Sequence, residues 1–106
     1  MVSRGDVWLA ALDPTVGSEI RKTRPCLVVS PDDLNRHLRT VAIVPMTTGS
    51  RRARFRVPIA FGGKEGLLLA DQLRTLDRRR LVKRLGHAEA ETLAAMLSVL
   101  RDMFAD

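Results

Sequence analysis

The sequence predicts an α+β fold in which a curled antiparallel sheet is followed by one C-terminal helix. Short apolar stretches bounded by proline or glycine recur through the first two thirds of the 106 residues, as in the strands of a sheet. The end of the chain changes to a helical period, with apolar side chains three and four positions apart. The length suits one folding unit, so we expect a single domain over residues 1–106.

Three apolar stretches predict the first three strands. Residues 6–12 lie between a glycine and a proline, residues 25–30 are flanked by two prolines, and residues 40–46 form the third stretch. The single cysteine, Cys26, falls in the second stretch, where we expect a small buried hydrophobe. One cysteine cannot form an intramolecular disulfide, which fits a reducing compartment.

The middle of the chain predicts a hairpin. Residues 54–60 alternate arginine with apolar side chains, so one face is basic, and Pro58 indicates an edge strand or a bulge. The glycine-rich turn at 62–64 leads to residues 66–73, which we interpret as the partner strand. Residues 81–85 predict a short last strand.

A single apolar stripe predicts the C-terminal helix. Two glutamates early in this segment and Arg101 near its end suit the two poles of a helix dipole. The stripe is formed by Leu93, Met96, Leu97, Leu100 and Phe104. We expect it to pack on the core.

The charge of the chain indicates an anionic partner. Eighteen Lys and Arg face twelve Asp and Glu, a net charge of +6, and fifteen of the cations are arginine, whose planar fork suits phosphate. Residues 1–86 carry seventeen cations and eight anions (+9), and residues 87–106 carry one cation and four anions (−3). Nucleic acid is the first candidate partner, although an arginine-rich proteome would give the same composition.

Several classes of function are disfavoured by what the sequence lacks. It contains no glycine-rich phosphate-binding motif, and its two histidines have no partner at a metal-ligand spacing, so we expect neither metal nor cofactor. Four aromatic residues are few for an RNA-stacking platform. No apolar stretch is long enough to span a membrane and no signal-peptide core begins the chain, so we expect a cytoplasmic protein.

Three segments without periodicity, residues 13–24, 31–39 and 47–53, are expected to be loops, and such loops often carry the chemistry of small sheet proteins. Further candidates lie in the predicted strand over 66–73. Each candidate also has an ordinary interpretation: a solvated acid, a surface cation, a turn-forming threonine, or, for Asp71, an ion-pair partner. The candidates are Ser18, Glu19, Lys22, Thr23, Arg24, Thr47, Thr48, Asp71 and Gln72.

Four motifs in a fixed order decide between these interpretations. They are RGDVWLAALDPTVGSE, KTRPCLVVSP, VAIVPMTT and GLLLADQLRTLDRRRL, and a helix follows them. In this combination the chain resembles the MazF/PemK family of toxin ribonucleases over residues 3–104. The resemblance implies an SH3-like β-barrel with a terminal helix, and a homodimer with an RNA groove across both subunits. It also implies metal-free cleavage of single-stranded RNA, and an acidic antitoxin that covers the groove.

The resemblance also assigns roles to residues. Arg24 of KTRP and Thr47 of PMTT match the principal catalytic positions, and Glu19 of GSE matches a loop acid near the site. One branch of the family has an arginine two residues before Asp71, where this chain has Leu69, so Asp71 is assigned to the groove. The expected RNA-binding residues are Ser18, Lys22, Thr23, Thr48, Ser50, Arg51, Arg52, Arg54, Asp71, Gln72 and Arg74.

Metal-free RNA cleavage suits these residue types. The ribose 2′-OH attacks the phosphorus and leaves a 2′,3′-cyclic phosphate and a 5′-OH, which requires a proton acceptor, a proton donor and a cation. We therefore expect Arg24 to stabilise the phosphorane and to help protonate the leaving 5′-oxygen, Thr47 to donate a hydrogen bond, and Glu19 to act as base.

Three alternatives stay open at this point. A gyrase poison of the CcdB type would share the architecture without nuclease activity, although the RP and PMTT motifs speak against it. A non-catalytic SH3-like nucleic-acid-binding module would keep the basic surface without needing Arg24 and Thr47 together. An inactive or antitoxin-only partner module would not need the complete set of motifs.

Overall fold

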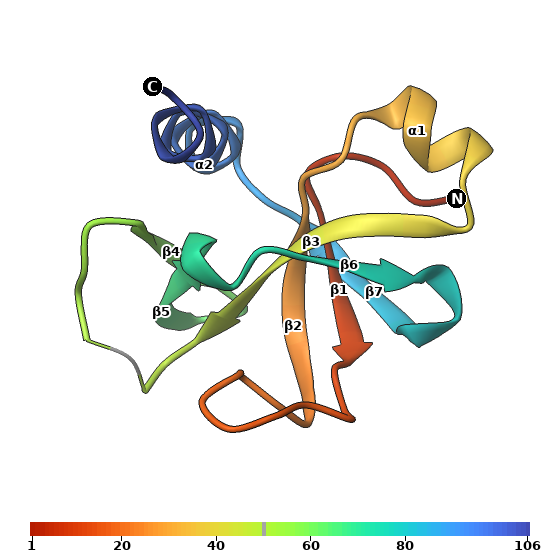
Figure 1. Cartoon of the computed structure of the whole chain (residues 1–106), viewed down its shortest axis with the longest axis horizontal. Helices are drawn as coiled ribbons and strands as arrows, with labels where there is room; N and C mark the ends of the chain where they lie inside the picture. The colour runs from red at the N-terminus through yellow and green to blue at the C-terminus, as the bar shows by residue number, and fades with distance from the viewer. Residues whose placement is uncertain (50) are drawn as a thin grey trace.

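The computed structural model describes residues 1–49 and 51–106, and within them seven strands form one curled antiparallel sheet with the order β4-β5-β3-β2-β1-β7 and β6 paired to β3. Figure 1 shows α2 to one side of the sheet, where it packs on β4. The predicted α+β class is confirmed. In chain order the elements are β1 (Asp6–Ala11), β2 (Thr23–Val28), α1 (Asp32–His37), β3 (Thr40–Thr47), β4 (Arg56–Phe61), β5 (Lys64–Leu69), the 3-10 turn η1 (Ala70–Gln72), β6 (Arg74–Asp77), the 3-10 turn η2 (Arg78–Arg80), β7 (Leu81–His87) and α2 (Ala90–Met103).

Strand β3 is the centre of the sheet. One of its edges pairs with β2, and its other edge is shared by two strands: residues 40–43 pair with β6, and residues 46–47 pair with β5. The chain changes from β5 to β6 through η1, so the sheet bends at this point. The last residue of β3, Thr47, therefore lies between β2 and β5.

Two apolar clusters form the core, one for each face of the central strands, because side chains alternate along a strand. Leu27 belongs to the cluster that packs under α2, where Met96 is fully buried, and its neighbours Cys26 and Val28 belong to the other cluster. The predicted helical stripe is confirmed except for Phe104. Helix α2 ends at Met103, so Phe104 leaves the stripe and is 71% exposed, and Met103 packs against the core instead.

The hairpin prediction is confirmed at its turn. Phe61 pairs directly with Lys64, and the two glycines between them have positive φ values of 60° and 76°, which a two-residue hairpin turn requires. Pro58 lies on β4, an edge strand, as predicted. The partner strand was predicted over residues 66–73. The observed strand β5 begins two residues earlier, at Lys64, and ends at Leu69.

The structure contains a helix and a strand that the sequence did not predict, α1 and β6. The expected loop at 31–39 holds α1, whose first turn is acidic and last turn basic, as a helix dipole favours. This helix is tied to the sheet by a buried pair in which Ser30 Oγ donates to Asn35 Oδ1 at 2.6 Å. Strand β6 is too short to produce a periodic signal, so the sequence did not reveal it.

Cys26 is the small buried hydrophobe that the sequence predicts. Its side chain is fully buried, and burial raises the pKa of the thiol to about 12, against a smaller opposing effect of Arg74. The thiol is therefore protonated and shielded in the folded protein. Among the described helices, none is long and apolar enough to cross a membrane.

Candidate active site

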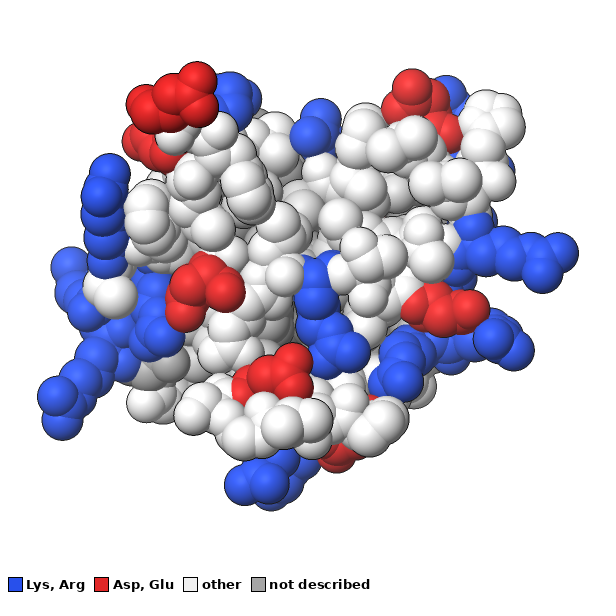
Figure 2. Space-filling model, in the orientation of Figure 1, with Lys and Arg blue, Asp and Glu red and all other residues white. Residues whose placement is uncertain are grey.

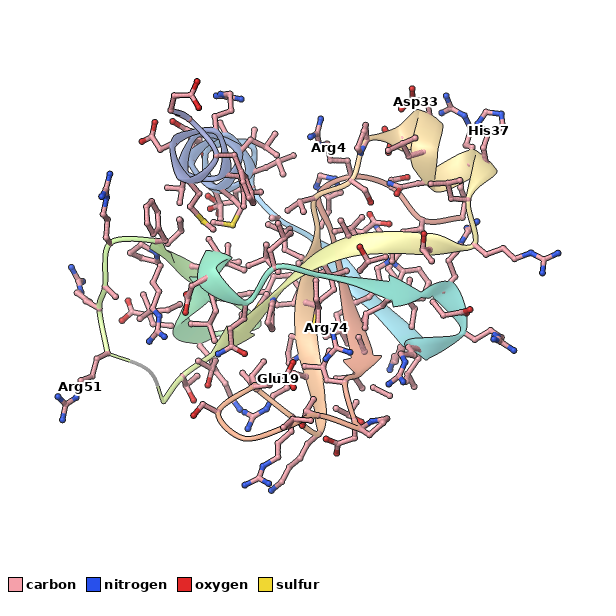
Figure 3. All side chains as sticks on the ribbon, viewed as in Figure 1. Arg4, Glu19, Asp33, His37, Arg51 and Arg74 are labelled. Atoms are coloured by element: carbon pink, nitrogen blue, oxygen red, sulfur yellow. The ribbon has the colours of Figure 1, made fainter. Side chains whose placement is uncertain are left out.

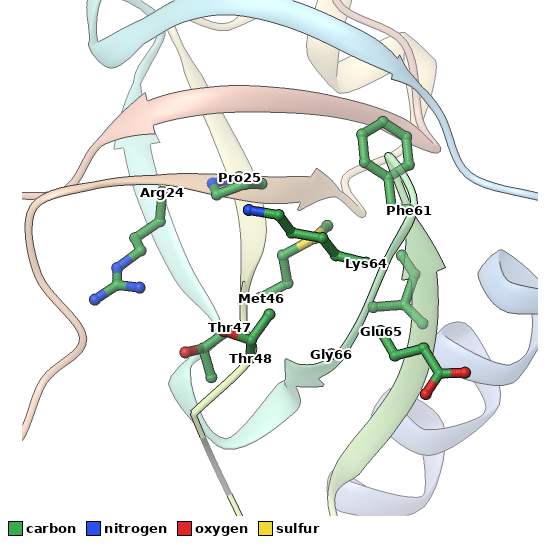
Figure 4. A pocket seen from close by; sticks show the side chains of 10 residues that line it. Arg24, Pro25, Met46, Thr47, Thr48, Phe61, Lys64, Glu65 and Gly66 are labelled. Carbon is green, nitrogen blue, oxygen red and sulfur yellow. The ribbon is translucent and has the colours of Figure 1, made fainter.

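A hollow of about 200 Å³ opens between the start of β2, the end of β3 and the β4–β5 hairpin (Figure 4). Continuing the β2–β3 register from Cys26 and Pro45 places Arg24 opposite Thr47. The structure therefore brings together the two residues that the family resemblance assigns to catalysis. The lining residues are Arg24, Pro25, Met46, Thr47, Thr48, Ile59, Phe61, Lys64, Glu65 and Gly66.

Among the described residues, a hydrogen bond to its own loop holds the Arg24 side chain through Nε. Its Nε donates to the carbonyl oxygen of Arg21 at 3.2 Å, which fixes the side chain against its own loop. Within residues 1–49 and 51–106, the structure gives neither terminal nitrogen a partner, and the side chain is half-buried. Two adjacent N–H groups on a planar cation can hold two phosphoryl oxygens at once.

Among the described residues, no acceptor is found for the hydroxyl proton of Thr47. Its Oγ1 accepts a hydrogen bond from the backbone N–H of Gly49 at 3.3 Å, so the hydroxyl hydrogen remains available to an oxygen in the hollow. The position of Thr47 depends on Gly66 of β5, because a Cβ at that glycine would lie 2.8 Å from the Thr47 carbonyl oxygen. Only glycine lets the two strands approach this closely.

Glu19 lies elsewhere, in a second hollow formed by the β1–β2 loop and η1. Its Oε1 accepts from the Val16 N–H at 2.6 Å, and the loop is tied to η1 by the Ile20 N–H, which donates to Gln72 Oε1 at 2.6 Å. Figure 3 shows Glu19 and Arg74 at the same part of the molecule. The structure thus places the predicted catalytic residues in two hollows, with Arg24 and Thr47 in the first and Glu19 in the second. The second hollow is lined by Ser18, Glu19, Ile20, Asp71, Gln72, Leu73 and Arg74.

Asp71 is an ion-pair partner, the ordinary interpretation that the sequence left open. Its two carboxylate oxygens accept from Arg56 Nε at 3.2 Å and Nη2 at 3.1 Å, and this hydrogen bonding raises the pKa of Arg56. Arg56 also donates to the carbonyl oxygen of Arg51. The pair joins η1 to the first residue of β4, so Asp71 helps to fix the wall of the second hollow.

The other predicted RNA-binding residues are spread over the surface. Lys22 and Thr23 are exposed where β2 begins, and neither lines one of the two hollows. Arg51 projects from the β3–β4 connection, away from the second hollow (Figure 3). Arg52 lines a shallow third hollow beside the hairpin, and Arg54 stacks on Phe55 at 4.7 Å. Ser50 lies outside the described residues.

Basic side chains project from two sides of the face shown in Figure 2, over the β3–β4 connection and over the β6–β7 corner. At that corner Arg79 is paired with Asp77, and the resulting hydrogen bonds lower the pKa of Asp77. Figure 2 shows acidic side chains over α2, just above the basic side chains of the β3–β4 connection.

The hairpin contributes residues that the sequence analysis did not single out. Phe61, Lys64 and Gly66 line the first hollow, although Lys64 had been interpreted only as part of a turn. A glycine inside an apolar strand is a signal of close backbone approach, and Gly66 carried that signal. Within the described residues, no three His, Cys, Asp or Glu side chains gather into a group that could hold a metal ion.

The chain is similar to known proteins over most of its length. Residues 3–104 match the family model described as PemK-like, MazF-like toxin of type II toxin–antitoxin system. The chain is 41% identical over 83 residues to endoribonuclease PemK of Escherichia coli; the match covers 74% of this chain and 62% of that relative, which is under two thirds of its length.

Two solved structures are similar over nearly the whole chain. The MazF crystal structure from Deinococcus radiodurans has a TM-score of 0.86 and 30% identity, covering 96% of this chain and 94% of that one. A mycobacterial endoribonuclease in complex with its cognate antitoxin has a TM-score of 0.81 and 26% identity, covering 96% and 93%.

Proposed function

The chain belongs to the PemK-like, MazF-like toxins of type II toxin–antitoxin systems, and we propose that it is a toxin endoribonuclease that cleaves single-stranded RNA at short sequences without a metal ion. The family that its motifs indicated is thereby confirmed. We propose further that residues 1–106 act as one toxin domain and that the protein works in the cytoplasm, where its substrate is found.

One observation carries the proposal: the β2–β3 register sets Arg24 and Thr47 opposite one another in a hollow (Figure 4). The two residues come from motifs more than twenty positions apart in the chain. A cationic fork and a hydroxyl donor facing one space are the groups that a phosphorane needs. A module that only binds nucleic acid would not require them in the same hollow.

The reaction assigned to this site balances without an external reagent. The 2′-oxygen attacks the phosphorus and gives its proton to Glu19, and the bond from phosphorus to the 5′-oxygen breaks as that oxygen takes up a proton from Arg24. Glu19 then releases its proton to solvent and Arg24 regains one, so both residues return to their starting states. The products are a 2′,3′-cyclic phosphate and a 5′-OH. Arg24 binds two oxygens of the pentacoordinate phosphorus, and Thr47 donates to one of them.

Glu19 is the proposed proton acceptor. Its carboxylate is exposed and lies on the connection that leads into Arg24, so RNA bound across both hollows would contact the two residues together. We expect Glu19→Gln to lower the cleavage rate, because an amide cannot accept the proton of the 2′-OH. Single-turnover rates in EDTA at saturating protein measure this. A variant that cleaves within twofold of the wild-type rate removes Glu19 from the role.

The basic residues on the rim hold the RNA backbone in this proposal. The mycobacterial relative was solved with its cognate antitoxin, and we propose that an acidic antitoxin covers the same surface here. We propose a homodimer as well, because the edge strand β7 leaves Val82 61% exposed and Leu85 39% exposed, next to a strand edge that pairs with no other described strand.

The proposed function is tested with purified protein and a long single-stranded RNA in EDTA. We expect discrete cuts whose downstream fragments begin with a 5′-OH, because the chemistry uses the ribose 2′-OH in place of a metal-bound water. Mapping the fragment ends gives the recognised sequence. RNA that is bound but never cut would point to a binding module, and inhibition of gyrase without cleavage would point to a gyrase poison.

A further inference from the structure

The side chains of the β4–β5 hairpin add a second cation to the hollow that holds Arg24 and Thr47. Lys64 is the first residue of β5, and the alternation of side chains along that strand places it on the same face as Gly66. Figure 4 shows its ammonium group extending toward Pro25, on the strand that carries Arg24, whereas the Glu65 carboxylate points away from Arg24 and Thr47. The hollow therefore has cations on two of its walls.

The backbone beneath Lys64 is fixed at three points. The two-glycine turn sets the pair between Phe61 and Lys64, and the Phe61 ring packs so closely on β7 that a Cβ at Gly86 would lie 3.1 Å from its Cζ. At the other end, Gly66 lies against the Thr47 carbonyl. Lys64 thus starts from a backbone position that is set relative to the catalytic threonine.

The Lys64 ammonium group is available to a ligand. Among the ion pairs and side-chain hydrogen bonds of the described residues, none involves Lys64, although the Glu65 carboxylate is next to it in the chain. A lysine solvated on an open surface needs no explanation. A lysine that extends into a hollow also lined by Arg24 places two like charges around one space, and an anion bound there would offset their repulsion.

We propose that Lys64 is a further catalytic residue, which contacts the scissile phosphate of the RNA from the wall opposite Arg24 and stabilises the extra negative charge of the pentacoordinate phosphorus. This inference rests on the proposed ribonuclease function. The Lys64 charge acts mainly when the extra negative charge develops on the pentacoordinate phosphorus. Removing it should therefore lower the cleavage rate more than the affinity for RNA.

The test compares Lys64→Met, Lys64→Arg and the wild type on a short RNA that contains the mapped cut site. Lys64→Met keeps most of the length and removes the charge, and Lys64→Arg restores the charge. Arg36→Met is the matched control, because it removes one exposed cation from α1, which does not line the hollow. Binding is measured on the same RNA with a 2′-deoxy nucleotide at the cut site, which lacks the nucleophile.

We expect Lys64→Met to lower the single-turnover rate at saturating protein about 10- to 100-fold, less than the loss of a fully buried donor because Lys64 is exposed at the rim. Lys64→Arg should recover most of the rate. Affinity for the deoxy RNA should fall by a smaller factor, and its salt dependence should lose about 0.7 in log–log slope, as for one phosphate contact. Arg36→Met should match the wild type in rate.

Two results would overturn the assignment of Lys64. One is a saturated rate within twofold of the wild type with weaker binding, which would place Lys64 on a flanking phosphate. The other is no change in either quantity, which would make it a surface charge. If the wild type and Arg36→Met cut no RNA, the proposed ribonuclease function fails and the inference about Lys64 fails with it.

Discussion

Replacing Arg24 by alanine is expected to lower RNA cleavage by about 10³-fold, the largest loss that we expect from any single substitution in the hollow. A loss of this size corresponds to about 4 kcal/mol of transition-state stabilisation. Arg24→Ala removes both terminal N–H groups and the charge that face the hollow, whereas the backbone of β2 keeps its pairing with β1 and β3. The measurement is the single-turnover rate in EDTA at saturating protein.

Two further variants show whether the loss in Arg24→Ala comes from the planar fork of this arginine or from charge alone. Arg24→Lys keeps the charge and loses the planar fork, so its rate should lie between those of the wild type and the alanine variant if two phosphoryl oxygens are held at once. Arg36→Ala, on α1, removes a cation that lines neither hollow, and its rate should equal that of the wild type. An Arg24→Ala enzyme that retains more than a tenth of the rate would exclude Arg24 from the chemistry.

The sequence predicted the sheet wherever local pattern and tertiary structure agree. The apolar runs at 25–30 and 40–46 became β2 and β3, and the two glycines of the hairpin became a tight turn with positive φ. The pattern failed at 66–73, because this segment covers most of β5, the 3-10 turn η1 and the residue before β6. That break is imposed by β3, whose edge is shared by β5 and β6, and a single-strand pattern cannot encode such sharing.

The part of the site that contains Arg24 and Thr47 was predictable, because there too the local pattern agrees with the tertiary structure. Arg24 and Thr47 stand at the ends of two strands that pair, so motif and topology agree. Glu19 lies in another hollow because its loop is tied to η1 through Gln72, a contact across fifty-two positions that no local pattern contains. Lys64 lines the hollow because of the register of the β4–β5 hairpin. The sequence predicted the turn of this hairpin, but it did not predict that Phe61 packs on Gly86 of β7.

Asp6, the acid of the opening RGD segment, shows how such a motif supports the fold without touching the site. The residue is only 2% exposed, and its carboxylate accepts hydrogen bonds from the Ser3 N–H at 3.0 Å and from Trp8 Nε1 at 3.3 Å. Its other oxygen pairs with Arg84 of β7 at 3.2 Å. One side chain therefore joins the N-terminal segment, β1 and the edge strand.

We expect Asp6→Ala to lower the free energy of unfolding by about 2–4 kcal/mol, because two partly buried N–H groups lose their acceptor. The ion pair adds less, since the Arg84 side chain is 50% exposed and can be hydrated when its partner is gone. Equilibrium denaturation measures the change. Asp102→Ala removes an exposed carboxylate from α2 and should stay within about 0.5 kcal/mol of the wild type.

Cys26 supplies an independent measure of the same change. Its thiol is buried and its pKa is raised to about 12, so it should react with a thiol reagent near neutral pH only when the sheet opens. Asp6→Ala should therefore increase the labelling rate of Cys26 by at least tenfold, in proportion to the larger open population, because each 1.4 kcal/mol of lost stability multiplies that population about tenfold. Unchanged denaturation and unchanged labelling would show that Asp6 is dispensable for the fold, and its buried contacts would then need another explanation.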